Sequence, residues 1–94
     1  MIAPTTVRAG ATIVNKRGLH ARASAKFVET AARFQSEITV TKGDAKVSGR
    51  SIMGLMMLAA SMGSAIELSA EGPDAADAIQ TLLALIAAKF HEDV

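Results

Sequence analysis

The sequence has no cysteine, tryptophan or tyrosine, and only two prolines among its 94 residues. Without cysteine there is no disulfide, no thiolate metal ligand and no cysteine nucleophile, which fits a reducing compartment. The apolar runs are shorter than the roughly 20 residues needed to cross a bilayer, and residues 1–10 lack the apolar core of a signal peptide. We therefore expect a cytoplasmic protein that does not bind membranes.

The charge is low overall but unevenly distributed. The net charge is +1 and the only aromatic side chains are three phenylalanines, whereas nucleic-acid binders normally combine a basic surface with stacking aromatics. We expect no nucleic-acid partner. Residues 1–50 hold nine Lys/Arg and three Asp/Glu (+6), and residues 51–94 hold one Lys and six Asp/Glu (−5). The first half can attract a small anion or an acidic partner, unless folding mixes the two halves over one surface.

The hydrophobic pattern predicts one α+β domain over residues 1–94, with an ordered core over about 7–90. The predicted elements are a strand within 7–14, a helix from Ala21, strands over 37–41 and 45–48, a helix after Ser51, a strand over 65–69 and a helix after Asp74. The last helix carries the apolar stripe Ile79, Leu82, Leu83, Ile86 and Phe90. This βαββαβα order favours a mostly antiparallel sheet with helices on one face.

Few residues can carry chemistry. There is no G-x-x-x-x-G-K-[S/T] loop for ATP, and the two histidines, His20 and His91, lie 71 positions apart without a carboxylate cluster beside either. We expect neither a metal site nor a cofactor. His91 follows the last helix, where an imidazole favours the negative helix end or faces water.

His20 follows a glycine-containing loop and precedes the first helix, so it should occupy or adjoin the helix N-cap. The N–H groups at a helix N-terminus stabilise a phosphate, and Arg22 offers five further donors to the same anion. A neutral imidazole keeps one nucleophilic lone pair. These features suit a histidine that accepts a phosphoryl group reversibly, although the residues alone leave a capping or surface histidine open.

Two motifs point to a family. They are NKRGLHAR over residues 15–22 and RSIMG over residues 50–54, with the segments SEITVT (36–41) and SAEG (69–72) also matching. With these motifs the sequence resembles the histidine-containing phosphocarrier protein HPr of the phosphoenolpyruvate-dependent phosphotransferase system, from about Val7 to Phe90. It is also similar to the nitrogen-related phosphocarrier NPr. The resemblance implies an open-faced β-sandwich of four antiparallel strands and three helices.

The resemblance also implies a phosphocarrier rather than an enzyme. His20 would be phosphorylated at Nδ1 by phosphorylated enzyme I and would pass the group to IIA-type acceptors, while Arg22 binds and shields it. One position departs from the family, because Ala23 stands where proline is common. Alanine still fits the first helical turn, so we expect altered helix rigidity rather than lost phosphorylation.

The helix after Ser51 is apolar on more than one side. Its side chains Ile52, Met53, Leu55, Met56, Met57 and Leu58 cannot all face one core in a single short helix. We assign Leu55 and Leu58 to the core. To partner docking we assign Ile52, Met53, Met56, Arg17, Arg22 and Arg50, because flexible methionines suit a surface that binds several partners. The alternative is a helix buried on both sides.

Ser51 has two roles to consider. As an N-cap it stabilises the helix, and the resemblance places it at the serine that HPr kinase/phosphorylase modifies in many bacteria. A phosphate there would put about −2 charge beside the apolar docking residues and weaken docking to enzyme I without unfolding the protein. That regulation depends on a kinase partner, which the sequence does not identify.

Other functions stay open from sequence. A regulatory module of the same fold could act by docking without phosphoryl relay. A small enzyme with His20 as general base is disfavoured, because no second catalytic group lies near it in the motif. The sequence does not distinguish sugar transport from nitrogen-related regulation, and we expect a monomer.

Overall fold

The sheet has four strands and is antiparallel throughout. In this computed structural model, which describes residues 5–92, the strand order is β1-β4-β2-β3, with all neighbours antiparallel. The strands are β1 (Thr6–Thr12), β2 (Glu37–Lys42), β3 (Ala45–Ser48) and β4 (Ala65–Glu71). The hairpin between β2 and β3 turns at Gly43, as the Lys42-Gly43-Asp44 sequence predicts.

Side chains alternate between the two faces of this sheet. In β4, Ile66, Leu68 and Ala70 are buried, whereas Glu67 and Glu71 are exposed. The exposed face is polar, with a shallow depression lined by Thr6, Arg8, Glu37, Thr39, Lys46, Ser69 and Glu71. One face is therefore committed to the core and the other to solvent.

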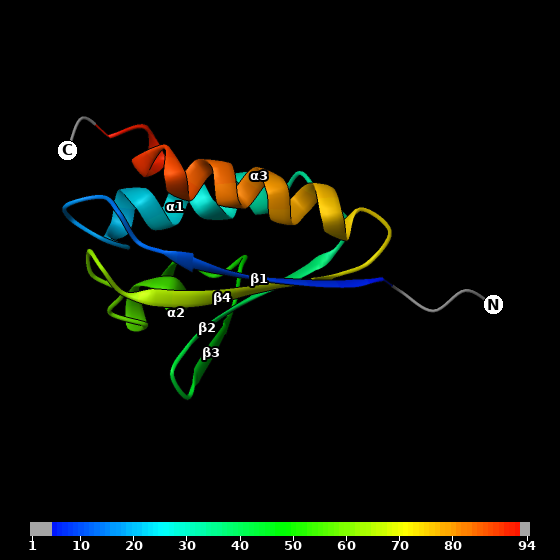
Figure 1. The fold of residues 1–94 in the computed structure, drawn as a ribbon, viewed down its shortest axis with the longest axis horizontal. Helices are drawn as coiled ribbons and strands as arrows, with labels where there is room; N and C mark the ends of the chain where they lie inside the picture. Colours follow the sequence, from blue (N-terminus) through cyan, green and yellow to red (C-terminus); the bar gives the residue numbers. More distant parts are fainter. Residues whose placement is uncertain (1–4, 93–94) are drawn as a thin grey trace.

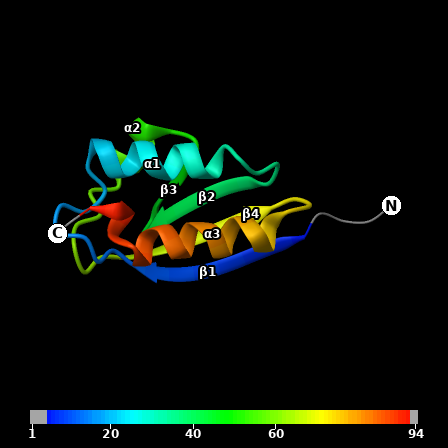
Figure 2. The ribbon, with the colours of Figure 1, turned by 90° about the horizontal axis from the view of Figure 1, so that it is seen from above.

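Three helices pack against this sheet. They are α1 (Ala21–Ala31), α2 (Ile52–Met57) and α3 (Ala75–Ala87). Figures 1 and 2 show α1 and α3 side by side over one face, while α2 lies beside α1 and contacts β3. The predicted α+β open-faced sandwich is confirmed. Within residues 5–92, no helix is long and apolar enough to cross a membrane.

The core lies between the sheet and the helices. Phe27 of α1 and Leu82 of α3 are fully buried there, together with Leu55 of α2. On α3, the predicted stripe is correct for Ile79, Leu82 and Ile86, which are buried, and Leu83 is half-buried.

The stripe prediction is wrong for Phe90. The helix ends at Ala87, and Phe90 belongs to the following turn, η1 (Lys89–His91), although its side chain is still fully buried. The apolar spacing continues past the helix because Phe90 reaches the same core from a different backbone conformation. Residues 1–4 and 93–94, which belong to the predicted domain span, lie outside the described residues.

Candidate functional site

The loop before α1 is held rigidly by Gly18. Its φ is +66°, and a Cβ at this position would lie 2.4 Å from the carbonyl oxygen of Ala60. The next N–H, of Leu19, donates to that same carbonyl at 2.9 Å. Only glycine fits so close an approach in this conformation, so the loop is pinned against the segment after α2.

The side chain of Asn15 stabilises the same loop by a hydrogen bond within it. Its side chain is fully buried, and Nδ2 donates to the carbonyl of Gly18 at 2.8 Å. The position of His20, two residues after Gly18, therefore depends on a buried amide and a glycine rather than on a flexible loop.

His20 is the N-cap of α1, as predicted. Its carbonyl accepts from the N–H of Ser24 at 2.9 Å, and its side chain makes no capping hydrogen bond. The ring lines a shallow depression together with Arg17, Leu19 and residues 59–61. Because the first-turn N–H groups of a helix have no partner within the helix, this end of α1 can receive an anion beside the imidazole.

A carboxylate from the far end of the sequence contacts His20. Nε2 of His20 lies 2.5 Å from Oε2 of Glu92, and Oε1 of Glu92 accepts from Nδ2 of Asn15 at 2.8 Å. Both side chains are largely buried, at 17% exposed for His20 and 11% for Glu92. Both carboxylate oxygens are thus engaged, and Asn15 links the loop to Glu92.

The environment keeps Glu92 ionised. Burial raises the pKa of the carboxyl, but the hydrogen bonds from Asn15 and His20, with electrostatic attraction from His20 and Arg17, bring the pKa below its ordinary value. The site therefore contains a fixed negative charge among basic neighbours.

The turn that precedes Glu92 has an unusual backbone conformation. Lys89, Phe90 and His91 have φ values of +58°, +55° and +62°, the left-handed region that costs about 1–2 kcal/mol per non-glycine residue. The turn is anchored by the buried Phe90 side chain and by Lys26 of α1, whose Nζ donates to the Phe90 carbonyl at 2.7 Å. These contacts offset the backbone cost.

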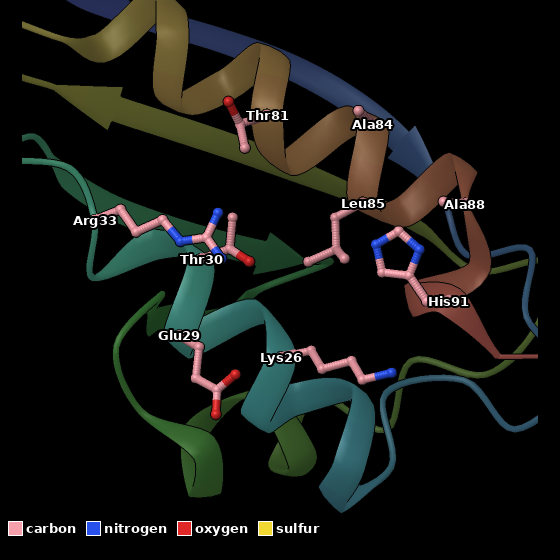
Figure 3. A pocket seen from close by; sticks show the side chains of 9 residues that line it. All are labelled: Lys26, Glu29, Thr30, Arg33, Thr81, Ala84, Leu85, Ala88 and His91. Carbon is pink, nitrogen blue, oxygen red and sulfur yellow. The ribbon is translucent and has the colours of Figure 1, made fainter.

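A second hollow of the surface does not include His20. It is a groove of about 550 Å³ between α1 and α3, lined by Lys26, Glu29, Thr30, Arg33, Thr81, Ala84, Leu85, Ala88 and His91. Figure 3 shows Lys26 reaching along this groove towards the turn that carries His91. The exposed His91 ring borders the groove rather than the His20 site.

The predicted arginines separate into two groups. Arg17 and Arg22 are exposed and lie in the sequence on either side of His20. Arg50 is elsewhere: its Nη2 donates to the carbonyl of Phe34 at 2.7 Å, beyond the C-terminal end of α1. Since His20 starts α1, the structure does not bring Arg50 into the group of side chains around His20.

The α2 region matches the prediction in its burial. Leu55 and Leu58 are buried, whereas Ile52, Met53 and Met56 are exposed, Met53 to 69%. A helix buried on both sides is thus contradicted. Sequence reasoning passed over Met57, the most exposed of these apolar side chains at 78%.

Ser51 caps α2 as predicted. Its Oγ accepts from the N–H of Gly54 at 2.9 Å. Within residues 5–92, no group of three or more His, Asp or Glu side chains is placed to hold a metal ion.

Sequence reasoning missed Glu92. It stands 72 positions from His20 and outside every motif, and only its acidity in a chain whose basic residues cluster around His20 could have drawn attention to it. The argument that no second catalytic group lies near His20 was made for the motif alone, whereas in the folded protein the carboxylate of Glu92 contacts the ring.

Comparison with known proteins connects this geometry to a family. The family model described as "PTS HPr component phosphorylation site" matches residues 7–88. The phosphocarrier protein HPr of Neisseria meningitidis serogroup A is 58% identical over 80 residues, covering 85% of this chain and 90% of that protein. The phosphocarrier protein NPr of Shewanella violacea is 47% identical over 81 residues, covering 86% and 89%.

Solved structures agree with the sequence relatives. The crystal structure of HPr from Thermoanaerobacter tengcongensis matches with a TM-score of 0.89 at 48% identity, covering 94% of this chain and 99% of that one. The HPr structure from Bacillus anthracis matches with a TM-score of 0.83 at 39% identity, covering 87% and 98%.

Proposed function

Because the chain belongs to the HPr family of phosphocarriers of the phosphotransferase system, we propose that His20 accepts a phosphoryl group from phosphorylated enzyme I and donates it to IIA-type acceptors. The family consists of carriers rather than classical enzymes. The protein would be acceptor in one encounter and donor in the next, and the partner would supply the remaining catalytic groups.

The proposed step is a displacement at phosphorus. The lone pair on Nδ1 of His20 forms an N–P bond, and the bond between phosphorus and the donor group of enzyme I breaks, its electron pair staying with that group. Transfer to a IIA-type acceptor repeats the displacement with the acceptor's nucleophile attacking and the electron pair returning to Nδ1. No metal or cofactor enters the proposal.

The observation that carries this proposal is the position of His20 at the N-terminus of α1, where no side chain makes a capping hydrogen bond. The backbone N–H groups and the partial positive charge of the helix end favour the phosphoryl oxygens next to the ring. Arg22, exposed in the first turn, would add charge-assisted hydrogen bonds, and Arg17 would add positive charge at the loop.

The docking surface in this proposal is the exposed part of α2. We call Ile52, Met53 and Met56 the apolar patch; Arg17 and Arg22 provide basic residues near His20, and Arg50 adjoins the start of α2. A mobile thioether surface with a basic border suits acidic partners of different shape, such as enzyme I and IIA-type proteins.

The test is incubation with enzyme I and labelled phosphoenolpyruvate. We expect an acid-labile phosphate on His20 and complete loss of label in His20→Ala, with an unchanged thermal unfolding curve as the control for folding. His91→Ala is the matched control, because it removes the other histidine, and should label fully. Equal labelling of His20→Ala and the wild type contradicts the proposal.

A second candidate function is a regulatory module that acts by docking alone. The exposure of Met53 and Met57 favours it, because a carrier site at His20 does not itself require such a large apolar surface. Met53→Glu separates the two functions. If in-vivo function survives His20→Ala but is lost in Met53→Glu, docking without relay is the function.

Ser51 would be the regulatory site if an HPr kinase/phosphorylase acts on this protein. Its cap geometry tolerates an anion at the helix start, but the added charge would adjoin Ile52 and Met53. We expect a phosphate on Ser51, or the mimic Ser51→Asp, to lower the affinity for enzyme I without lowering thermal stability. Unchanged affinity in both forms contradicts this role.

The relatives include both HPr and NPr proteins, so the branch is decided by the partner. Comparing initial phosphorylation rates with a sugar-type and a nitrogen-type enzyme I assigns it. We place the protein in the cytoplasm, where both partners would meet it, and propose that it acts as a monomer. Sedimentation at working concentrations tests that state.

A further inference from the structure

The acidic C-terminal half contributes one side chain to the basic site of the first half. Glu92 contacts Nε2 of His20 on one oxygen and Nδ2 of Asn15 on the other. Asn15 is fully buried and also holds the carbonyl of Gly18, two residues before His20. The carboxylate is therefore fixed relative to the imidazole by the same amide that shapes the loop.

The backbone that carries Glu92 is held in a conformation that non-glycine residues avoid. Three consecutive residues, 89–91, are left-handed, and the N–H of Glu92 donates to the carbonyl of Lys89 at 3.0 Å. Nζ of Lys26 in α1 donates to the carbonyl of Phe90, the middle residue of this turn. Strained backbone that is held from several sides is characteristic of functional positions.

The contact decides which ring nitrogen carries the proton. An ionised carboxylate only accepts hydrogen bonds, so the neutral imidazole must present N–H at Nε2 and its lone pair at Nδ1. Nδ1 is the nitrogen that the proposed relay uses. The contact thus selects the tautomer that is ready to attack phosphorus.

We propose that Glu92 is a positioning residue for phosphoryl transfer, which fixes His20 in the Nε2–H tautomer and stabilises the ring when Nδ1 carries the phosphoryl group. This inference rests on the proposed function of His20. When the Nδ1 lone pair forms the N–P bond, Nε2 keeps its proton and the ring gains one positive charge. Glu92 already faces that proton, so the step needs no proton transfer.

The negative charge of Glu92 also acts when His20 donates the phosphoryl group. On donation, the N–P bond breaks, the electron pair returns to Nδ1 and the ring leaves as neutral imidazole with its Nε2–H still bonded to Glu92. Because Nε2 keeps its proton, the leaving group is neutral imidazole rather than imidazolate, and the N–P bond breaks more readily. Glu92 would assist both encounters without touching the phosphoryl group.

The experiment combines ring ¹⁵N NMR with phosphorylation kinetics. In the wild type we expect the neutral His20 ring to give the signals of the Nε2–H tautomer, and in Glu92→Ala a mixture of both tautomers. The initial rate of phosphorylation by enzyme I should fall about tenfold in Glu92→Ala, the lower end of the loss found when a group that orients a metal-ligating histidine is removed. Glu92→Gln, which keeps an acceptor but no charge, should retain more of the tautomer preference than of the rate.

Two further variants sharpen the test. Glu67→Gln, an exposed carboxylate on β4, is the matched control and should leave both measurements unchanged. Lys26→Met removes the anchor of the turn without touching His20, and should reproduce the Glu92→Ala effects in weaker form. A purely structural role for Glu92 would lower stability without changing the tautomer signals.

The inference is overturned if Glu92→Ala keeps both the wild-type tautomer signals and the wild-type rate within twofold. His20→Ala distinguishes this failure from failure of the relay itself. If His20→Ala is labelled as well as the wild type, the relay proposal fails, while the ¹⁵N signals of the unphosphorylated protein still judge the contact with Glu92.

Discussion

The two ends of α1 use similar polar residues for opposite purposes. At the C-terminal end, the segment that follows the helix is fixed: Arg50 bonds to the carbonyl of Phe34, and Asp74 accepts from the N–H groups of Gln35 and Ser36 at 2.9 Å and from Oγ of Ser36 at 2.6 Å. At the N-terminal end, the helix has no side-chain cap and His20 lines an open depression.

This difference shows which end of α1 can bind a ligand. Polar groups that are bonded to each other stabilise the fold but have little left for a ligand, whereas unpaired N–H groups at a helix start are available to an anion. The N-terminal end is nevertheless not loose, because Gly18, Asn15 and Glu92 fix the histidine from behind. Rigidity is supplied there by residues that leave the front of the site free.

The largest effect should come from Gly18→Ala, which breaks the support of the N-terminal end. The new Cβ would lie 2.4 Å from the Ala60 carbonyl oxygen in a left-handed conformation, so we expect a loss of about 3 kcal/mol in the free energy of unfolding and displacement of His20. Gly43→Ala is the control, because Gly43 is also left-handed but has open space around it. It should cost about 1 kcal/mol. Equal losses in urea unfolding would contradict the steric account.

At the C-terminal end of α1, the carboxylate of Asp74 should make the stability of the fold depend on pH, with a loss of stability at acidic pH. The hydrogen bond from Ser36 chiefly lowers the pKa of this carboxyl below its ordinary value of 3.8, helped by the backbone of Gln35. A lowered pKa in the folded state contributes stability above the ordinary pKa and loses it as the pH falls through the folded value. Asp74→Asn should therefore be less stable than the wild type at pH 7, and the difference should shrink below about pH 4. A pH-independent difference in thermal unfolding would show that the charge plays no part.

A smaller loss is expected at the start of α2. Ser51→Ala removes the hydrogen bond from the Gly54 N–H and should cost about 1 kcal/mol in chemical unfolding. Ser51→Asp restores an acceptor and should recover most of this loss. No loss in the alanine variant would mean that the short helix is held by Leu55 packing alone.

The smallest effect should come from Ala23→Pro, which tests the one departure from the family pattern. Ala23 lies in the first turn of α1, where an N–H has no partner within the helix, so proline breaks no backbone hydrogen bond. We expect phosphorylation rates within about twofold of the wild type. A loss of labelling would show that the N–H of Ala23 itself is needed at the phosphoryl group.

The sequence predicted well the helices and strands whose hydrophobic residues recur with a regular period. The alternation in β4 and the three- and four-residue spacing in α1 reflect burial on one face, and such periodic patterns can be found without coordinates. The N-cap position of His20 was also predictable, because a glycine-containing loop ends and a helical pattern begins there. Family resemblance added the role of the histidine, which periodicity cannot supply.

Contacts between distant segments could not be predicted. The meeting of His20 with Glu92 depends on a left-handed turn of ordinary residues, for which there is no local signal such as glycine. Arg50 was assigned to partner docking together with Arg17 and Arg22, yet its guanidinium donates to the carbonyl of Phe34 at the other end of α1. The charge pattern of a sequence gives the sign of each side chain's charge but not its position in the folded protein.

The contact of Glu92 with His20 matters for how the protein is handled in the laboratory. A dye, affinity tag or surface linker attached next to Glu92 lies beside the group that contacts His20, and would perturb the measurements meant to report on it. Figure 1 shows the start of β1 at the opposite end of the molecule from that turn. Attachment ahead of Thr6 therefore leaves the histidine and its carboxylate as the native chain presents them.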